Sequence, residues 1–327
     1  MSYSGFLKIA FLVLLVAGVA FPSRAQTTTT VIAGNLGPGS TYQSGTGTAW
    51  ATGPGAPQCN NAPCDPANAV GFTIPVSGPH YLLTQVKIAA NWSAGTDSVL
   101  VGLYVSPGPN TAASINSAKL LHSFTLTATT QSVAQLFTVP IKPILLVPGN
   151  TYFIEMTESN SNTNWGWQWN NQGQNGYYAE FLNLSNPSWI AETVVTPAFE
   201  VDGTPITTPV FVSTHQGGQI LVVDGDTPGT VAVVYSSSCD GGTCPEGIVV
   251  GPDGKIYMAD PTGSTIRRID RSGANIETLF TSCVGTSCPT GPQAPSFSSS
   301  PAGDLYFVDS GSGKTNEVFM VAGAAKA

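Results

Sequence analysis

The residues most suited to chemistry in this sequence are three tryptophans in the segment Trp165-Gly-Trp-Gln-Trp169. On a β-strand, the period of two places Trp165, Trp167 and Trp169 on one face. Flat aromatic rings on a sheet face can stack against sugar rings, with the alternating polar residues as hydrogen-bonding groups. The same pattern also suits large side chains that cover one end of a core. The sequence therefore leaves two hypotheses open: core packing, or contact with a glycan or other ligand.

Three aspartates form the second group, because Asp224, Asp260 and Asp309 end three similar segments. A ring of carboxylates near a channel could hold Ca²⁺ or another divalent ion through oxygen ligands. In the alternative, each Asp accepts backbone N–H bonds and caps a turn at the end of a strand. A feature present in every repeat usually serves every repeat, so we expect the turn role. Apart from Ca²⁺ or another divalent ion in that alternative role, we predict no cofactor.

The cysteines form three pairs, each with four residues between its members. The pairs are Cys59 with Cys64, Cys239 with Cys244, and Cys283 with Cys288. Turn-forming residues fill these intervals, so we expect local disulfides that close short loops. A metal site is the alternative reading. It has less support, because no His lies near any pair and exported proteins usually oxidise such thiols.

Residues for nucleophilic catalysis are sparse in this chain. Such catalysis needs a nucleophile, a base and an orienting group in one place. The three histidines, His80, His122 and His215, lie in no Gly-x-Ser-x-Gly or His-Glu-x-x-His motif. Glu155 and Glu158 would face opposite sides of a strand. The sequence leaves open the hypothesis that two carboxylates from distant segments pair for glycoside hydrolysis. We therefore predict no catalytic residue.

The first 25 residues have the layout of a secretory signal peptide. Lys8 supplies a positive charge, Ile9 to Phe21 is apolar, and Ser23-Arg24-Ala25 offers a cleavage site. The apolar run is shorter than the roughly 20 residues that span a bilayer, with an uncleaved N-terminal anchor as the alternative. We expect residues 1–25 to be removed. The protein would then be secreted, periplasmic or at the cell surface, without a transmembrane segment.

The charge composition indicates which classes of macromolecule this protein is expected to bind. Charged residues make up 9% of the chain, the formal net charge is −8, and no cluster of Lys and Arg occurs. Nucleic acid is therefore not an expected partner.

The elements that must position these residues are strands. Short runs rich in β-branched and aromatic residues, separated by Gly, Pro, Asn and Ser, predict an all-β protein. Residues 26–203 contain enough runs for a jelly-roll-like β-sandwich. Residues 204–209 contain two prolines and predict a stiff linker.

Residues 210–327 contain an internal repeat. The segments Gly218–Asp224, Gly254–Asp260 and Gly303–Asp309 share one pattern, and each precedes a turn and another β run. Such a unit is typical of a propeller blade, and the remaining length suffices for about three. Closed propellers usually have about four to eight blades, so we expect an incomplete propeller.

The first module resembles the choice-of-anchor R domain of exported bacterial proteins. The resemblance rests on the order and spacing of Val70–Thr73, Tyr81–Ile88, Val99–Tyr104, Leu146–Ile154 and Pro197–Pro205. It implies a jelly-roll-like surface module without an established activity.

The second module resembles NHL and gluconolactonase-like propeller repeats, most clearly over Pro245–Asp260. Such repeats mostly form binding surfaces, and some relatives are metal-dependent lactonases or lyases. No full ligand set of those enzymes matches here.

Two functions follow as hypotheses. The leading one is an exported, non-enzymatic surface or secreted scaffold that binds a protein or a glycan. The alternative is a metal-dependent lactonase- or lyase-like propeller enzyme, or the remnant of a longer propeller.

Overall fold

The computed structural model describes about two thirds of the chain. Its described residues are 29–44, 49–52, 67–107, 110–158, 163–181, 189–214, 217–226, 231–237, 245, 247–260, 265–281, 292–297, 303–309 and 317–324. Among them, no helix combines the length and apolarity needed to cross a membrane.

Two of the sequence-based predictions fall outside these ranges. One is the signal peptide, residues 1–25. The other is the set of three local disulfides, whose members are Cys59, Cys64, Cys239, Cys244, Cys283 and Cys288. Both therefore stay predictions, and so does the choice between disulfides and a metal site at these cysteines.

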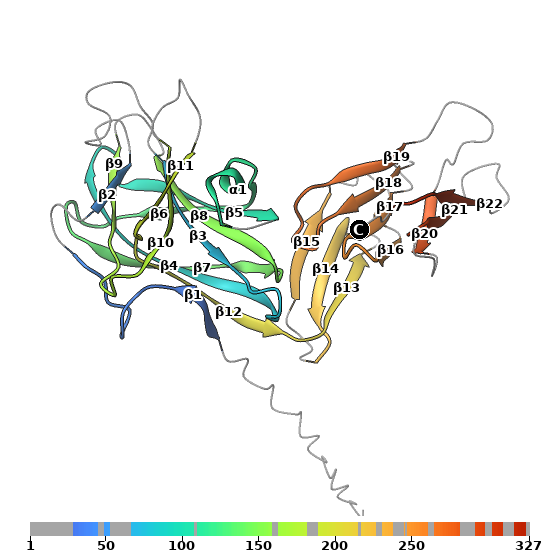
Figure 1. The fold of residues 1–327 in the computed structure, drawn as a ribbon, viewed down its shortest axis with the longest axis horizontal. Coiled ribbons are helices and arrows are strands. Elements are labelled where there is room, and N and C mark those ends of the chain that lie inside the picture. Colours follow the sequence, from blue (N-terminus) through green and yellow to red (C-terminus); the bar gives the residue numbers. More distant parts are fainter. Residues whose placement is uncertain are drawn as a thin grey trace, which may run out of the picture.

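The first module is a sandwich of two six-stranded antiparallel sheets (Figure 1). One sheet, here the lower sheet, has the order β1-β12-β4-β9-β2, with β7 paired to β4 beside it. Its strands are β1 (Thr30–Gly34), β2 (Ala49–Thr52), β4 (His80–Ala94), β7 (Gln135–Leu146), β9 (Asn164–Gln168) and β12 (Phe199–Ile206).

The other sheet, here the upper sheet, has the order β11-β10-β3-β8-β5-β6. Its strands are β3 (Ala67–Thr73), β5 (Ser98–Pro107), β6 (Lys119–Thr127), β8 (Asn150–Glu158), β10 (Asn175–Phe181) and β11 (Trp189–Val195). One short helix, α1 (Ala112–Asn116), follows β5, and Thr111 caps it by accepting the Ser114 N–H.

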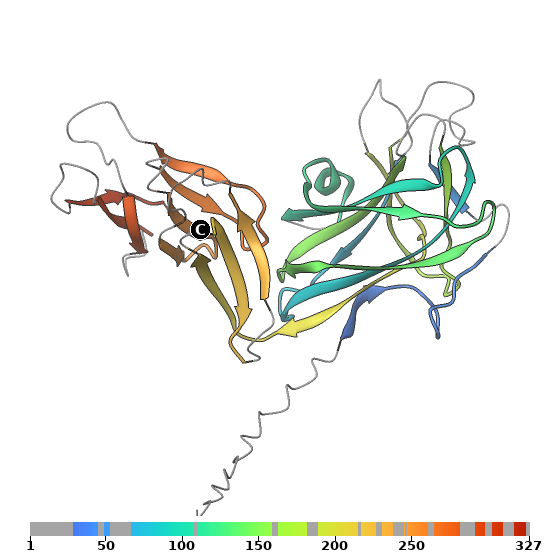
Figure 2. The ribbon, with the colours of Figure 1, turned by 180° about the vertical axis from the view of Figure 1, so that it is seen from behind.

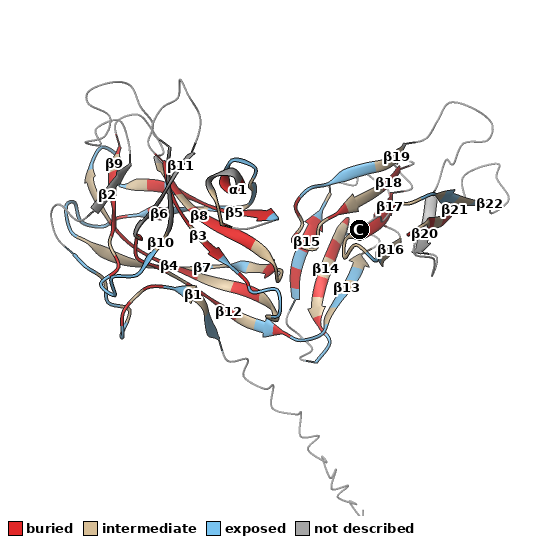
Figure 3. Cartoon of the chain, in the orientation of Figure 1, coloured by how far each residue is buried: buried red, intermediate tan, exposed pale blue. Residues whose placement is uncertain are grey.

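Alternation along the strands builds the core between these sheets. Val99, Val101, Leu103 and Val105 of β5 are buried on the inner face, and β8 and β3 add Ile154 and Val70. β-branched residues at alternate positions suit a half-buried pleated surface, which explains why this segment forms a strand. Figure 3 shows buried residues along the strands of both sheets.

The second module consists of three successive antiparallel sheets in the described part of the chain. Their strands are β13 (Pro209–Thr214), β14 (Gln219–Asp224) and β15 (Val231–Ser236), then β16 (Gly247–Val250), β17 (Ile256–Asp260), β18 (Thr265–Ile269) and β19 (Glu277–Thr281), then β20 (Pro292–Phe297), β21 (Leu305–Asp309) and β22 (Glu317–Val321). The three repeated segments form β14, β17 and β21, the middle strands of these sheets.

The sheets of the second module pack on one another in chain order. Ile220 and Val222 of β14 share a cluster with Ile256 and Met258 of β17. Phe307 of β21 shares the next cluster with residues of β17 and β18. The prediction of an all-β protein, with a sandwich followed by a partial propeller-like repeat region, is confirmed.

The connection between the modules is shorter than the expected linker of residues 204–209. β12 stays paired with β4 through Ile206, which lies opposite His80, and β13 begins at Pro209. Only Thr207 and Thr208 stand between these strands. The Asp226 carboxylate accepts hydrogen bonds from both threonine hydroxyls, at 2.8 Å for Thr208, and these bonds lower the pKa of Asp226.

The two modules also share a hydrophobic cluster. Leu82 and Leu145 of the sandwich are buried in the same cluster as Ile220 and Val222 of β14, and β15 lies against β7. Figure 2 shows β15 beside the edge of the sandwich from the opposite side. Burial of these aliphatic side chains away from water fixes one module against the other.

Candidate binding site between the two modules

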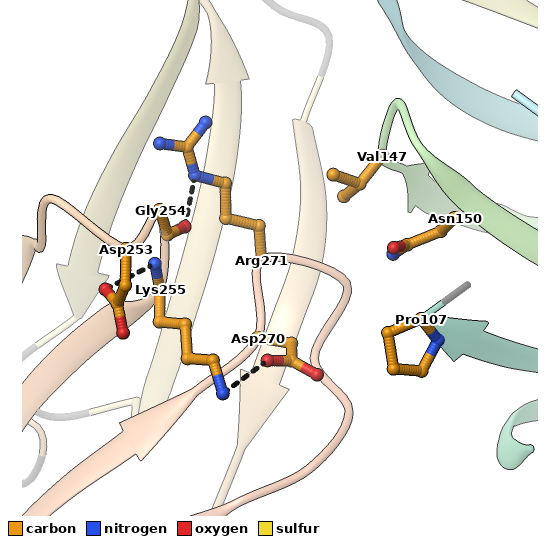
Figure 4. Close-up of a pocket in the computed structure, with 8 residues that line it drawn as sticks. All are labelled: Pro107, Val147, Asn150, Asp253, Gly254, Lys255, Asp270 and Arg271. Carbon is orange, nitrogen blue, oxygen red and sulfur yellow. Dashed lines mark hydrogen bonds and ion pairs between the residues drawn. The ribbon is translucent and has the colours of Figure 1, made fainter. Parts of the chain in front are cut away.

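Two pockets lie where the sandwich meets the second repeat sheet, and Lys255 lines both of them. The first has a volume of about 260 Å³ (Figure 4). Its lining residues are Pro107, Val147 and Asn150 of the sandwich and Asp253, Gly254, Lys255, Asp270 and Arg271 of the repeat. We call the two pockets together the inter-module groove.

Two tight turns supply the repeat side of the first pocket. The turn before β17 contains Gly254 at φ +76°, and the Asp253 carboxylate accepts the backbone N–H of Lys255 at 3.1 Å. The turn after β18 contains Gly273 at φ +86°, where the Gly273 N–H donates to the Asp270 carbonyl at 2.9 Å. Glycine reaches such positive φ values without steric cost, so these residues permit both turns.

Charges of both signs line this pocket. The Lys255 Nζ lies 3.4 Å from Asp270 Oδ1, and Arg271 Nε donates to the Gly254 carbonyl at 2.6 Å. The Arg271 guanidinium also lies over the ring of Phe211, 6.0 Å from its centre. Burial lowers the pKa of Arg271. A network of this kind holds the wall of the pocket in one shape.

His80 lies beside this network at the start of β4. Its pKa is lowered by burial and by the positive charge of Arg271. Its Nε2 is buried and has no hydrogen-bond partner within the described part of the chain. His80 therefore lies half-buried at the junction of the two modules.

The second pocket is larger, at about 510 Å³. Its lining residues are Lys119 and Leu120 of β6, together with Lys255, Gly273, Ala274, Asn275, Ile276 and Glu277 of the repeat. Leu120 and Ile276 are 54% and 51% exposed, one from each module. Two exposed aliphatic side chains that line one pocket, with Lys119, Lys255 and Glu277 also in its lining, favour a partner that has both an apolar group and charges.

The tryptophan segment lies elsewhere and is mostly core. Trp165 and Trp167 of β9 are fully buried in the sandwich, and Trp167 Nε1 donates to the Ala198 carbonyl at 2.9 Å. Trp165 packs against Phe137, with ring centres 5.7 Å apart. Only Trp169 is partly exposed. Three rings that stack against a glycan would all need to lie at the surface. The burial of Trp165 and Trp167 therefore favours the core-packing hypothesis.

The repeated aspartates lie on three different sheets. Asp224 Oδ1 accepts the backbone N–H of Asp226 at 3.1 Å, which is the geometry of a turn cap. Asp260 forms an ion pair with Arg267 at 3.3 Å. The side chain of Asp309 lies outside the described part of the structure. Within that part, no group of three or more His, Cys, Asp or Glu side chains lies close enough to hold a metal ion.

Glu155 is a largely buried carboxyl beside the ring of Tyr104, an environment that the sequence did not indicate. It lies on the outer face of β8, opposite Gly102 of β5 and Ala69 of β3. A Cβ on Gly102 would lie 2.5 Å from a ring carbon of Tyr104, so that ring folds across Gly102 toward Glu155. Burial raises the pKa of Glu155 to about 7, while a hydrogen bond from Tyr104 opposes the rise.

No sequence signal marks Leu120 and Ile276 as site residues. Leu120 is followed by Leu121 in an ordinary strand sequence, and Ile276 stands between Asn275 and Glu277. Only the packing of the modules brings the two residues to one pocket. His215, by contrast, lies outside the described residues, as the six cysteines do.

Comparison with known families gives one short match. A family model described as strictosidine synthase-like, N-terminal, matches residues 238–268, which include β16, β17 and most of β18. No curated protein matches the chain.

Three solved structures are similar to parts of the chain. The calcium-binding protein regucalcin from Agrobacterium tumefaciens is 17% identical over 44% of this chain and 48% of its own, with a TM-score of 0.25. A luciferin-regenerating enzyme is 9% identical over 78% of this chain and 96% of its own, with a TM-score of 0.28. The cysteine protease and lectin-like domains of a surface layer associated protein of Clostridium difficile are 13% identical over 43% and 32%, with a TM-score of 0.29.

The chain thus spans about half of the regucalcin chain and about a third of the Clostridium difficile chain. These scores carry no argument about function. The family match coincides with the second repeat sheet, and it supports the propeller-like reading of that segment.

Proposed function

We propose that this protein is an exported, non-enzymatic binding scaffold whose ligand is a polypeptide segment held in the inter-module groove. The proposal rests on Leu120 and Ile276, which line one pocket from the two different modules and are each about half exposed. An inserted aliphatic or aromatic side chain would bury both of them.

The charges around the groove set the expected character of the ligand. Lys119 and Lys255 favour an acidic neighbour of the inserted side chain, and Glu277 favours a basic one. The shared cluster of Leu82, Leu145, Ile220 and Val222 holds the two walls at a fixed separation, which reduces the entropy lost on binding.

Export and the nature of the first module belong to the same proposal. The layout of residues 1–25 and the equally spaced cysteine pairs support an oxidising location. The β-sandwich fits the architecture that the choice-of-anchor R resemblance implies.

Selection of displayed random peptides on the full chain tests the proposal. Peptides selected on the wild-type protein should be depleted by counter-selection on Leu120→Asp or Ile276→Asp. Val76→Asp, at a residue 85% exposed and outside the groove, is the matched control and should retain the peptides. Peptides that bind all variants equally, or no enriched peptide, would overturn the proposal.

A metal-dependent lactonase-like enzyme is the second candidate, and the strictosidine synthase-like match over residues 238–268 favours it. Elemental analysis of the purified protein separates the two candidates. A stoichiometric divalent ion whose removal by a chelator abolishes lactone hydrolysis would support the enzyme. Protein that binds its peptide equally well with and without chelator supports the scaffold.

A further inference from the structure

A third cleft, in the sandwich and away from the inter-module groove, arises where the upper sheet divides. β10 pairs with β11 along its whole length, from Asn175 to Phe181. It pairs with β3 only from Tyr178, which lies opposite Val70, to Phe181, which lies opposite Ala67. β3 itself continues to Thr73 beside β8. Within the described residues, Gly71 to Thr73 therefore have a partner strand on one side only.

The gap left by this divergence is a cleft of about 300 Å³, which we call the sheet-split cleft. Its other wall is the edge strand β1, where Gly34 lies at the rim. Gly176 lies on the β10 side, where a Cβ would meet Thr196 Cγ2 at 3.0 Å.

The floor of the sheet-split cleft is aromatic. Phe72 and Phe199 both line it, with ring centres 6.1 Å apart and planes tilted by 31°. Tyr152 stacks behind Phe72 with ring centres 5.6 Å apart, which holds the Phe72 ring in place. Phe72 and Phe199 belong to the sandwich core and are 6% and 5% exposed, so only a small part of each ring forms this apolar floor. One C–H face of a small ring can lie over it.

The rim of the cleft is polar but uncharged. Asn35 is fixed because its Nδ2 donates to Thr196 Oγ1 and the Pro197 carbonyl, each at 2.8 Å, and its Oδ1 accepts the Phe199 N–H at 2.8 Å. Gln174 and Asn175 are exposed at the mouth, with amides that both donate and accept.

None of the lining residues carries a charge. The nearby Glu200 carboxylate is in an ion pair with Lys87, which also lies 3.0 Å from Asp202. A charged ligand would therefore lose its hydration without gaining an opposite charge.

From these observations we propose that the sheet-split cleft binds a neutral sugar ring, with its hydroxyls on Gln174, Asn175 and the open edge of β3 and one face over the narrow apolar floor that Phe72 and Phe199 leave exposed. The cleft volume lies at the lower end of the range for small-molecule sites, about 300–1,000 Å³, which suits one pyranose unit. Such a site is independent of the polypeptide site in the inter-module groove.

Saturation-transfer NMR on the full chain provides the test, with glucose, galactose, mannose and N-acetylglucosamine as probes and glucuronic acid and glucosamine as charged comparisons. At least one neutral sugar should receive saturation, and the charged ones should receive much less. The double variant Gln174→Ala, Asn175→Ala should bind that sugar roughly thirtyfold more weakly, because it loses two hydrogen bonds of about 1 kcal/mol each.

Gln172→Ala is the matched control, because Gln172 is an exposed amide of the same loop outside the lining of the cleft, and it should bind as the wild type does. Leu120→Asp should also leave sugar binding unchanged, which separates this site from the groove. No transfer to any neutral sugar, equal transfer to the charged sugars, or full binding by the double variant would overturn the proposal.

Discussion

Gly273 of the second repeat sheet lies directly against Val234 of β15, so closely that a Cβ on Gly273 would stand 2.1 Å from the Val234 carbonyl oxygen. The next residue, Ala274, is buried and belongs to the core cluster of the sandwich. This contact joins the second repeat sheet, the first repeat sheet and the sandwich at the edge of the inter-module groove.

Gly273→Ala should therefore destabilise the whole chain. Its φ of +86° and the contact with the Val234 carbonyl both oppose a side chain, so we expect a loss of about 3 kcal/mol in the free energy of unfolding. Gly39→Ala is the matched control, because Gly39 has φ +71° but open space around it, and it should lose only about 1 kcal/mol. Urea unfolding measures both values, and equal losses would show that the Val234 contact does not matter.

Glu155 should make stability fall between pH 4.5 and pH 7. Burial raises its pKa from 4.5 to about 7, so the folded state holds the proton over a range in which the unfolded state releases it. The stabilisation is complete below pH 4.5, and it is lost as the pH rises through 7, by on the order of 3 kcal/mol. Glu155→Gln should remove this loss when unfolding free energies are compared across the range.

Tyr104→Phe is the companion variant for Glu155. It removes the hydrogen bond that opposes the rise in the pKa of Glu155, so the fall in stability with pH should become larger. A wild-type profile identical to that of Glu155→Gln would contradict the burial of this carboxyl.

Trp167 should behave as a core residue. Trp167→Phe leaves the Ala198 carbonyl without its 2.9 Å donor and removes buried volume, so we expect a loss of about 2 kcal/mol. Trp169→Phe, in the same segment but partly exposed, should cost less. If both variants kept wild-type stability in chemical denaturation, the assignment of Trp167 to the core would be wrong.

Asp224 should act in folding and not in metal binding. Asp224→Ala removes the acceptor for the Asp226 N–H and should lower stability by about 1 kcal/mol. Asp224→Asn keeps an acceptor and should stay near the wild type, and chelator should change neither melting temperature. If Asp224 were a Ca²⁺ ligand, a chelator would lower the melting temperature of the wild type, and this effect would be lost in Asp224→Asn. That result would contradict the turn role.

The strands could be predicted from the sequence because their pattern is local. The alternation in Ser98–Tyr104 and the repeated segment ending at Asp224 each predict a strand, and they form β5 and β14. The alternation along β8 gave no sign that the ring of Tyr104 lies beside Glu155. That contact depends on Gly102 in a neighbouring strand.

The groove could not be predicted, because it depends on how two modules pack. The interval 204–209 was expected to separate them, whereas β12 runs to Ile206 and the hydroxyls of Thr207 and Thr208 bind Asp226. Leu120 and Ile276 face one pocket only as a result of that close connection.

The most direct measurement of the central claim is the dissociation constant of a selected peptide for the wild-type chain and three variants. Leu120→Asp and Ile276→Asp should each weaken binding by roughly tenfold or more, because each places a charge where an apolar side chain is buried on binding. Val76→Asp should bind as tightly as the wild type. Equal dissociation constants for all four proteins would contradict the assignment of the inter-module groove as the binding site.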